Sequence, residues 1–407
     1  MTVIDAPFPP DPSARAVVDL AAVRDNVEAL RAHAPSSEVM PVVKADGYGH
    51  GMLPAARAAL AGGATWLGTA TPTEALALRS AGVDLAQARV LTWLYAPGAP
   101  HAELCAADVD VAVAAPWALE EVAAGARAAG RTARVHLKVD TGLGRNGLTP
   151  ADLPDVVARA ARLEASGEVR VVGVMSHLAC ADEPGHPSIA RQAAEFEDAV
   201  RVVEAAGLRP DVRHLANSAA TLTAPGLHHD LVRPGIATYG LSPVPHLAPP
   251  SRYGLRPAMT LQARLATVKR VGAGQGVSYG HLYTTTSDTV LGVVPLGYAD
   301  GIPRHASGGS AGPGGPVRVG DGAGARVRRV AGRVCMDQVV LELGPGSDEH
   351  AGDVVTLFGA SDGLAHGSDL PSAEDWAHAA GTISYEIVTR IGTRVPRVYQ
   401  GKDEWSS

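Results

Sequence analysis

Short apolar runs alternate with amphipathic helical stretches from about residue 15 to residue 241. Between the runs, apolar residues recur every three or four positions, which predicts helices. Repeated alternation of strand and helix predicts a parallel sheet, and eight such units fit an α/β fold of the (β/α)8 TIM-type barrel, whose typical length is ~250 residues. A doubly wound open sheet is the rival fold. The predicted strands are 39–43, 66–69, 90–94, 109–113, 135–139, 171–175, 212–215 and 231–239, and the clearest predicted helices are 21–34, 116–129, 154–166 and 189–206.

The pattern changes after a proline-rich connection that follows Ser242. From there on, alternating apolar and polar residues without helices predict the antiparallel strands of a mostly β domain. We therefore expect a barrel over residues 1–245 and a β-strand domain over residues 246–407. The glycine-rich segment 306–316 is predicted to be a flexible surface loop. The predicted strands of this domain are 260–271, 290–295, 326–343, 353–358 and 394–399.

Composition narrows the class of protein. The 407 residues are 46% hydrophobic and 19% charged, which is typical of a globular chain with a sizeable core. A net charge of −7 disfavours a general binder of nucleic acid or of anionic membranes. No apolar stretch approaches the roughly 18 residues of a membrane span, and the three cysteines match neither a disulfide framework nor a zinc site. We expect a cytoplasmic protein whose partners are small molecules and other subunits.

Lysine is rare in this chain. Arginines outnumber lysines 31 to 4, and only a lysine amine can lose its proton and attack a carbonyl. Lys44 follows a buried-looking strand and precedes a glycine-rich turn, so it is expected at the carboxyl end of the barrel, where barrel enzymes place their chemistry. Burial there would lower its pKa and free the amine for a Schiff base. The alternative is a strand-end lysine that keeps its head in water. The other lysines are Lys138, Lys269 and Lys402.

The segment Val43-Lys44-Ala45-Asp46-Gly47-Tyr48-Gly49-His50-Gly51 resembles the pyridoxal phosphate attachment motif of alanine racemases, which are fold-type III pyridoxal phosphate enzymes. The resemblance covers roughly residues 15–399 and keeps the order of the family's motifs. It implies a homodimeric racemase that interconverts L-alanine and D-alanine and supplies D-alanine for peptidoglycan. The further matching segments are 138–145, 176–178, 214–219, 233–241, 276–280, 295–301, 334–338 and 383–386.

The resemblance also implies a cofactor site. Lys44 would bind pyridoxal phosphate covalently, and Arg233 would face the pyridine nitrogen. A guanidinium cannot readily protonate that nitrogen, so the ring stays a weaker electron sink and transamination is suppressed. The alternative for Arg233 is a buried ion pair, and Ser218 could simply cap a helix. The implied phosphate ligands are Ser218, the backbone of Gly235 and Ile236, and the hydroxyls of Tyr48 and Tyr385.

Racemisation needs one proton acceptor on each face of the α-carbon. By resemblance, Lys44 is the base for the D-enantiomer and Tyr279 is the base for the L-enantiomer. Tyr279 would reach the cofactor of the neighbouring subunit, which makes the active sites of the homodimer shared. A phenol of ordinary pKa near 10 needs help from neighbouring donors or positive charge. The implied helpers are His177, Arg233 and His214; the substrate carboxylate would be held by Arg145 and the Met336 amide, with Lys138 and Asp337 in support.

Several alternatives stay open at this stage. Lys138 beside Arg145 requires either a carbamate or a counter-anion. Gly142, Gly144 and Gly147 spell a dinucleotide fingerprint, but prolines interrupt the expected helix start. A broader serine racemase, a fold-type III amino-acid decarboxylase and a non-catalytic pyridoxal phosphate carrier are the rival functions. No further ligand lies at metal-site spacing from the pair His228 and His229, so no metal is assigned.

Overall fold

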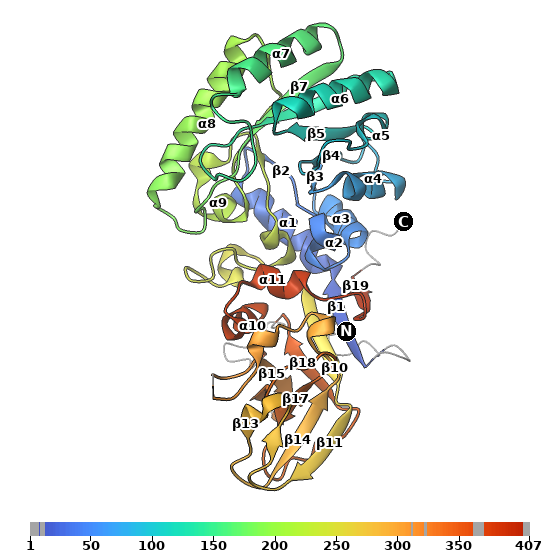
Figure 1. Cartoon of the computed structure of the whole chain (residues 1–407), viewed down its shortest axis with the longest axis vertical. Helices are drawn as coiled ribbons and strands as arrows, with labels where there is room; N and C mark the ends of the chain where they lie inside the picture. The colour runs from blue at the N-terminus through green and yellow to red at the C-terminus, as the bar shows by residue number, and fades with distance from the viewer. Residues whose placement is uncertain (1–7, 9–12, 311, 321–323, 361–369, 402–407) are drawn as a thin grey trace. The chain divides into compact units, whose positions relative to one another are not determined.

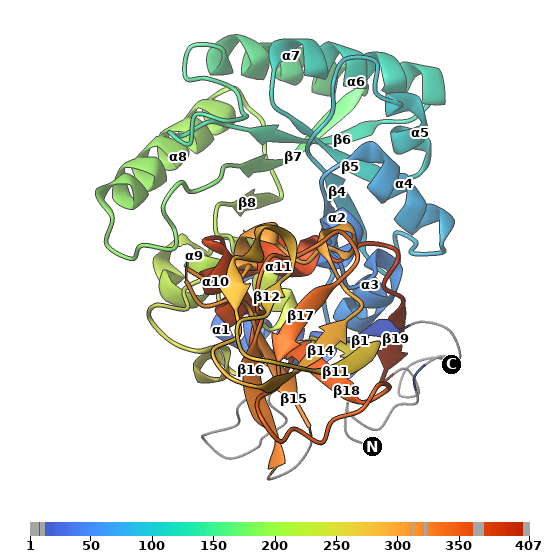
Figure 2. The ribbon, with the colours of Figure 1, turned by 60° about the horizontal axis from the view of Figure 1, so that its bottom comes forward.

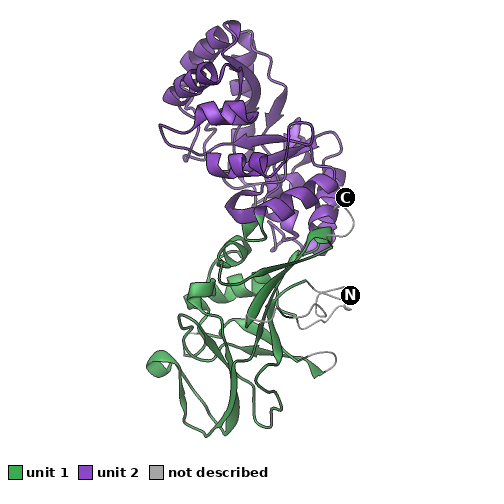
Figure 3. Ribbon diagram, turned by 90° about the vertical axis from the view of Figure 1, so that its right-hand side faces the viewer, with its two compact units in different colours: residues 1–22, 48–51, 256–407 green, residues 23–47, 52–255 purple. Residues whose placement is uncertain are grey.

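The structure is a computed structural model that describes residue 8 and residues 13–310, 312–320, 324–360 and 370–401. The chain divides into two compact units (Figure 3). One comprises residues 23–47 and 52–255, here called the barrel unit, and the other comprises residues 1–22, 48–51 and 256–407, here called the β unit. Each is described by itself below.

Parallel strands form the centre of the barrel unit (Figure 2). Six of them, β3 to β8, pair in chain order, and β2 pairs with β9. Single bridges join Val42 to Gly68 and Asn217 to Arg233, so the β2–β9 pair connects to both edges of the larger sheet. The predicted (β/α)8 fold is therefore confirmed over this fully described part of the chain. The strands are β2 (Glu38–Val39), β3 (Trp66–Thr69), β4 (Arg89–Thr92), β5 (Val109–Val113), β6 (Ala133–Lys138), β7 (Val169–Met175), β8 (Val212–His214) and β9 (Leu231–Val232).

Helices α4 to α8 cover the outside of this curled sheet (Figure 1). Proline occupies the first turn of α4, α6, α7 and α8, where its missing N–H costs no hydrogen bond. Alanines, valines and leucines between helices and strands form the main core. The helices are α1 (Leu20–His33), α2 (Lys44–Tyr48), α3 (Met52–Ala61), α4 (Pro72–Ser80), α5 (His101–Ala106), α6 (Pro116–Ala129), α7 (Leu153–Ala165), α8 (Pro187–Ala205) and α9 (Ser218–Thr223), with 3-10 turns at Pro225–Leu227, Ile236–Tyr239 and Pro250–Tyr253.

The predicted strand over 231–239 is wrong beyond Val232. Pro234 has no N–H to give to a ladder, and Gly235 bends the chain at φ −100° and ψ −91°. Residues Ile236–Tyr239 then form a buried 3-10 turn. This bend brings the backbone of Gly235 close to Ser218, which matters for the site.

One mixed sheet, one antiparallel sheet and a hairpin build the β unit; the mixed sheet is antiparallel except for the parallel pair of β1 with β19. The larger sheet has the order β16-β15-β18-β10-β1-β19, so the amino-terminal strand pairs with strands from the end of the chain. The strands are β1 (Ala14–Asp19), β10 (Met259–Arg264), β15 (Pro316–Val319), β16 (Arg326–Arg329), β18 (Val354–Phe358) and β19 (Arg397–Gln400) in this sheet, β11 (Thr267–Val271), β14 (Thr289–Val294) and β17 (Val339–Glu342) in the second, and β12 (Gly276–Val277) and β13 (Tyr283–Thr284) in the hairpin.

The prediction that the β unit lacks helices is wrong. Helix α10 (Ala373–Ala380) begins with a capping box between Ser372 and Asp375, and α11 (Ser384–Thr389) follows directly. Short 3-10 turns lie at Tyr279–His281, Tyr298–Asp300 and Arg304–Ala306. Where it is described, the glycine-rich segment 306–316 also packs, since the Gly308 backbone pairs with Gly332.

Candidate active site

Lys44 stands at the end of the segment that follows β2, as the sequence predicts. The next residues, Ala45, Asp46 and Gly47, adopt left-handed backbone angles, with φ of 53°, 52° and 62°. For residues other than glycine this conformation costs roughly 1–2 kcal/mol each. The turn is held by the Ala45 amide, which donates to Glu74 Oε1 at 2.7 Å, and by the Met52 amide, which donates to Asp46 Oδ1 at 2.9 Å. Such strain is typical of functional sites.

Burial lowers the pKa of the Lys44 amine, and the nearby positive charge of Arg145 lowers it further. Its Nζ lies 5.9 Å from the centre of the Trp93 ring. A lowered pKa increases the fraction of neutral amine, which is the form that attacks an aldehyde. The structure therefore gives Lys44 the chemical character expected from the sequence.

Positive charge gathers around this amine. Burial, Arg145 and Arg233 lower the pKa of Lys138 to about 8, and the same charges together with burial lower the pKa of His177 to about 3. Burial alone lowers the pKa of Arg233 to about 10. Four cationic side chains therefore lie within electrostatic reach of His177, namely Arg233, Arg145, Lys138 and Lys44.

The loop before α7 positions Arg145. Asp140 Oδ1 accepts the amides of Gly142 at 3.0 Å and Gly144 at 3.1 Å, which folds the glycine-rich segment around one carboxylate. Gly147 has a φ of +146°, and a Cβ there would come within 2.5 Å of the Asp140 nitrogen. These glycines form a loop that ends well before α7 begins at Leu153. They lack the helix start that dinucleotide binding requires.

Ser218, at the start of α9, organises a small cradle of backbone amides. Its Oγ accepts the amide of Gly235 at 2.7 Å and the amide of Ala237 at 3.3 Å. Asn217 Oδ1 caps the helix by accepting the Ala220 amide, so Ser218 itself is not the N-cap. The arrangement resembles the loop sites that bind phosphate in barrels after the seventh and eighth strands.

This donor set fits pyridoxal phosphate. The cofactor carries a dianionic phosphate, an aldehyde and a ring nitrogen, and its amino-acid substrates carry a carboxylate. The barrel unit supplies a deprotonatable lysine, a hydroxyl and amide cradle, and surrounding cations, which match those groups in kind. The residues present would thus suit the cofactor, because the negative charges of its phosphate and of the substrate carboxylate would balance the positive charges of the site.

Arg233 contacts both candidate helper histidines. Its Nη1 lies 3.2 Å from His214 Nδ1, and its Nη2 lies 3.5 Å from His177 Nδ1. Nη2 also donates to the carbonyl of Ser176 at 2.6 Å and to that of Leu215 at 3.2 Å. The guanidinium is 5% exposed, and its fixed contacts are to neutral acceptors rather than to a carboxylate. The contacts recorded for Arg233 are therefore hydrogen bonds to neutral groups, and they do not include the buried ion pair that was the alternative.

A pH dependence of stability follows from two buried histidines. Burial lowers the pKa of His136 and of His214 below 6.5, so both bind protons less readily in the folded chain than in the unfolded chain. Each should therefore remove at most about 1.4 kcal/mol of unfolding free energy per pH unit as pH falls below 6.5. Urea midpoints at about pH 7 and about pH 5.5 measure this. The control variant His305→Gln, which changes an exposed histidine, should show the same loss of unfolding free energy between the two pH values. Equal urea midpoints at the two pH values in the parent protein would contradict the prediction.

The β unit holds the remaining predicted residues. Tyr48 and Tyr385 lie together, with ring centres 6.3 Å apart, and burial raises the pKa of Tyr48. The Tyr48 hydroxyl therefore stays protonated near neutral pH and can act as a donor.

Tyr279 is the most exposed large hydrophobic residue recorded in the described chain, at 72%. It follows Ser278, whose backbone is left-handed at φ 61° and whose Oγ donates to the Arg333 carbonyl at 2.7 Å. Arg333 Nε in turn donates to the Tyr279 carbonyl at 3.3 Å. A strained turn with a fixed backbone thus presents an aromatic ring outward from its unit.

Met336 and Asp337 belong to one turn beside Tyr298. The Ala299 amide donates to the Met336 carbonyl at 2.9 Å, and the Met336 residue is 53% exposed. Asp337 accepts from Arg394 Nη1 at 2.8 Å, and the same guanidinium lies 3.1 Å from the buried Asp300. Asp337 therefore holds the turn rather than a reacting atom.

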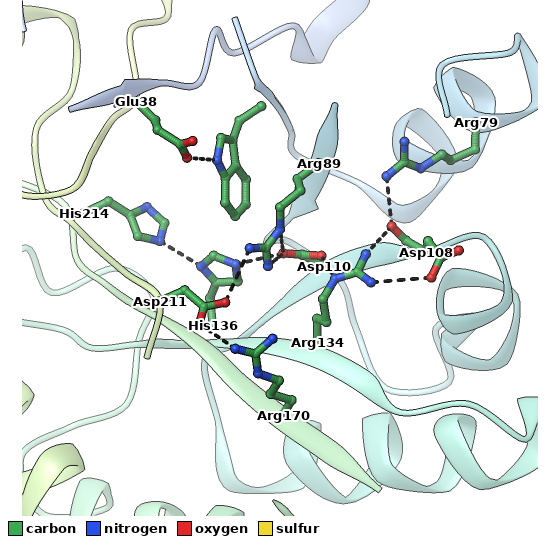
Figure 4. A network of polar contacts seen from close by, with 11 residues as sticks. Glu38, Arg79, Arg89, Asp108, Asp110, Arg134, His136, Arg170, Asp211 and His214 are labelled. Carbon is green, nitrogen blue, oxygen red and sulfur yellow. Dashed lines mark hydrogen bonds and ion pairs between the residues drawn. The ribbon is translucent and has the colours of Figure 1, made fainter. Parts of the chain in front are cut away.

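Sequence reasoning missed Asp110 and His136, two buried polar residues inside the barrel. On β6, Arg134, His136 and Lys138 alternate with apolar residues that belong to the main core. Polar residues at every second position of a strand predicted to be buried on both faces were the available signal, because alternate side chains share one face. Figure 4 shows His136 between His214 and Asp110.

Comparison with known proteins gives full-length similarity. Residues 18–243 match the family model "Alanine racemase, N-terminal domain", and residues 258–399 match "Alanine racemase, C-terminal domain". The alanine racemase of Streptomyces coelicolor is 59% identical over 388 residues, which is 95% of each chain, and that of Mycolicibacterium smegmatis is 48% identical over 394 residues, 96% of each.

Solved structures agree with these matches. That of an alanine racemase from D-cycloserine producing Streptomyces lavendulae has a TM-score of 0.91 at 56% identity, covering 97% of this chain and 98% of its own. The Streptomyces coelicolor structure has a TM-score of 0.90 at 59% identity, with coverage of 96% and 98%. Separately, none of the helices in the described part of the chain combines the length and apolar character needed to cross a membrane.

Proposed function

The chain belongs to the alanine racemase family, and on that premise we propose that it interconverts L-alanine and D-alanine with pyridoxal phosphate bound to Lys44. The observation that carries the proposal is the cluster at the end of the barrel strands. There an amine of lowered pKa, a serine cradle and a buried arginine lie in segments whose sequences resemble the family's motifs.

Each group of the cluster has a distinct binding task. The Ser218 hydroxyl and the Gly235 and Ile236 amides would hold the phosphate, with the Tyr48 and Tyr385 hydroxyls as further donors. Arg145 and the Met336 amide would hold the substrate carboxylate, because a guanidinium binds a planar carboxylate in a bidentate manner. Fixing both anions leaves the α-carbon facing the catalytic bases.

Two bases on opposite faces would exchange the α-proton. Once the substrate amine has replaced it on the cofactor, the neutral amine of Lys44 would accept the proton from the D-enantiomer, and the hydroxyl of Tyr279 would return a proton on the other face. Bound pyridoxal phosphate supplies an electron sink that makes the α-proton acidic. Arg233, which only donates hydrogen bonds, would leave the ring nitrogen unprotonated and so keep that sink weak. Proton exchange is then favoured over transamination.

Tyr279 would act in a homodimer. Its 72% exposure places a large amphipathic side chain on the surface of a single chain, and Met336 in the same unit is 53% exposed. Exposed aromatic and methionine side chains are typical of surfaces that bind a partner. We propose that both residues complete the active site of the neighbouring subunit, so that a monomer lacks one base.

Lys138 is proposed to carry a carbamate. Its pKa of about 8 leaves a sizeable neutral fraction that can react with carbon dioxide, and Arg145 repels its charged form. A carbamate would replace that repulsion by attraction. Protein exchanged into ¹³C-bicarbonate should show one carbamate carbon resonance that Lys138→Ala lacks; a parent spectrum without it would leave a bound anion as the counter-charge.

A chiral assay tests the activity. The purified protein with pyridoxal phosphate should convert L-alanine and D-alanine to the same equal mixture, because the enantiomers have equal free energies. L-serine and L-lysine measure the breadth of the pocket, and faster turnover of L-serine would favour the broader racemase. Carbon dioxide release from ornithine, lysine or diaminopimelate, without inversion of alanine, would overturn the proposal in favour of a decarboxylase. We further propose that the D-alanine is made in the cytoplasm for peptidoglycan.

A further inference from the structure

A chain of four buried polar side chains crosses the interior of the barrel unit. Arg233 Nη1 lies 3.2 Å from His214 Nδ1, His214 Nε2 lies 2.8 Å from His136 Nδ1, and His136 Nε2 lies 3.2 Å from Asp110 Oδ2. Arg233 is 5% exposed and the other three are fully buried. Figure 4 shows the part from His214 to the arginines around Asp110. Water therefore cannot replace a missing partner in this chain.

Asp110 is the acceptor at one end. Arg134 Nε donates to its Oδ1 at 2.6 Å, and Arg89 donates to its Oδ2. Although burial raises the pKa of Asp110, the hydrogen bond from His136 and the two arginine charges outweigh burial and lower it. The carboxylate therefore stays ionised and can only accept. The atom that faces it, His136 Nε2, must carry a hydrogen.

The remaining hydrogen positions follow step by step. A neutral His136 with hydrogen on Nε2 has a free pair on Nδ1, so His214 Nε2 must donate to it. His214 Nδ1 is then an acceptor, and it accepts from Arg233. The Arg233 guanidinium at the far end can only donate, so it independently requires His214 Nδ1 to be an acceptor. Both ends of the chain thus specify one tautomer for each histidine.

The strands are built to place His136 in this line. The pairing of β6 with β7 shifts register between Val135 and His136, and such bulges redirect side chains. His136 pairs with Gly173, where a Cβ would come within 2.1 Å of His136 Nδ1. The glycine interrupts an otherwise apolar run on a buried strand, and its lack of a side chain leaves the space that the imidazole fills.

The contacts of Arg233 are nearly used up by the protein. Both hydrogens on Nη2 have carbonyl acceptors, at Ser176 and Leu215, and one hydrogen on Nη1 goes to His214. Among the contacts recorded for the described residues, none uses the Nε hydrogen or the second hydrogen on Nη1. These two are the hydrogens that an acceptor from outside the chain can receive.

We propose that Asp110 is a positioning residue, which acts through His136 and His214 to fix the orientation of Arg233 and so the N–H groups that Arg233 offers to the cofactor ring. The proposal rests on the function proposed above, in which Arg233 faces the pyridine nitrogen. A reversed His136 would donate to His214 Nε2 and so force the hydrogen of His214 onto Nδ1, which would put an N–H of His214 against an N–H of Arg233. The guanidinium would then have to move.

The first test locates the hydrogens directly. Neutron diffraction from crystals of the full chain with pyridoxal phosphate, or ¹⁵N spectra of histidine-labelled holoenzyme, should show hydrogen on Nε2 and none on Nδ1 of both His136 and His214. Hydrogen on Nδ1 of either histidine would overturn the proposal. This readout needs no turnover, so its failure is distinct from failure of the proposed activity.

The second test replaces one oxygen of the Asp110 carboxylate by an NH2 group, which removes the requirement for a hydrogen on His136 Nε2. In Asp110→Asn, the donors of three side chains, Arg89, Arg134 and His136, meet a single acceptor oxygen, and the new amide favours the reversed tautomers. We expect kcat to fall about 10–100-fold with little change in KM, the range typical for residues that orient a ligand. The absorption maximum of the bound cofactor should also shift, and the ¹⁵N spectrum should show hydrogen on Nδ1 of at least one of the two histidines.

Asp108→Asn is the matched control. Asp108 accepts from Arg131 at 2.7 Å and from Arg134 at 3.4 Å, so this variant also removes a carboxylate beside Arg134 while leaving the histidines untouched. Its φ of +53° suits asparagine. Activity and spectra should stay within two-fold of the parent. Equal losses in both variants, or an unchanged kcat in Asp110→Asn, would refute the role; if Asp110→Asn does not fold, the hydrogen positions in the parent protein still decide.

Discussion

Lys44→Ala should lower racemisation in both directions by about 10³-fold or more, since one residue supplies both the covalent link to the cofactor and one of the two bases. General acid–base catalysis alone contributes typically 10²–10⁴-fold, and loss of the covalent link adds to this. The visible absorption band of the lysine-bound cofactor should disappear. Initial rates with each enantiomer and an absorption spectrum of the reconstituted protein measure the two effects.

Lys269→Ala provides the matched control. Lys269 is an exposed lysine on β11, so its loss removes the same amine from a site without the buried cations that surround Lys44. Its rate and spectrum should match the parent protein. A Lys44→Ala protein that retains the band would show that another group binds the aldehyde, and the assignment of Lys44 would then be wrong.

Tyr279→Phe should lower racemisation about 10²–10⁴-fold in both directions, since it removes only the hydroxyl that exchanges a proton. Both directions are affected because each removes a proton from one face of the α-carbon and adds a proton to the other, so each direction uses both bases. Tyr283→Phe, which removes a hydroxyl hydrogen-bonded to Glu342 on β17, should stay within a few-fold of the parent. A Tyr279→Phe enzyme of normal rate would defeat the two-base assignment.

Mixing the two inactive variants tests whether the active site is shared. A dimer of one Lys44→Ala chain with one Tyr279→Phe chain has one site with both residues intact and one site with neither, provided that Tyr279 acts on the neighbouring subunit. Random exchange makes about half of the dimers mixed, so about a quarter of the parent activity should return. Without exchange, or with both residues acting in one chain, activity stays at the level of the separate variants. Cross-linking of differently tagged chains confirms that exchange has occurred.

Local sequence determined much of the barrel. The helix over 116–129 and the strands 66–69 and 109–113 have the predicted bounds, because repeating apolar positions and terminal prolines or glycines specify such elements through near neighbours. Lys44 was identified for the same kind of reason, since it follows a strand and precedes a glycine-rich turn, whereas Arg145, Ser218 and Arg233 were identified only by resemblance to the family's motifs. Arg145 lies close enough to lower the pKa of the Lys44 amine.

Only the tertiary structure decided features that depend on distant partners. The pairing of β1 with β10 joins residues more than two hundred positions apart, and nothing in the alternation of 14–19 specifies it. The missed helices α10 and α11 are short, and short helices gain most of their stability from packing. Asp110 on β5 and His136 on β6 are linked to Arg233 only through His214 on β8. These contacts exist only once the sheet has curled. Patterns of neighbouring residues therefore encoded many of the elements and pointed to Lys44 as the candidate reactive lysine, whereas the direction of a buried hydrogen-bond chain depended on which side chains the closed barrel brings together.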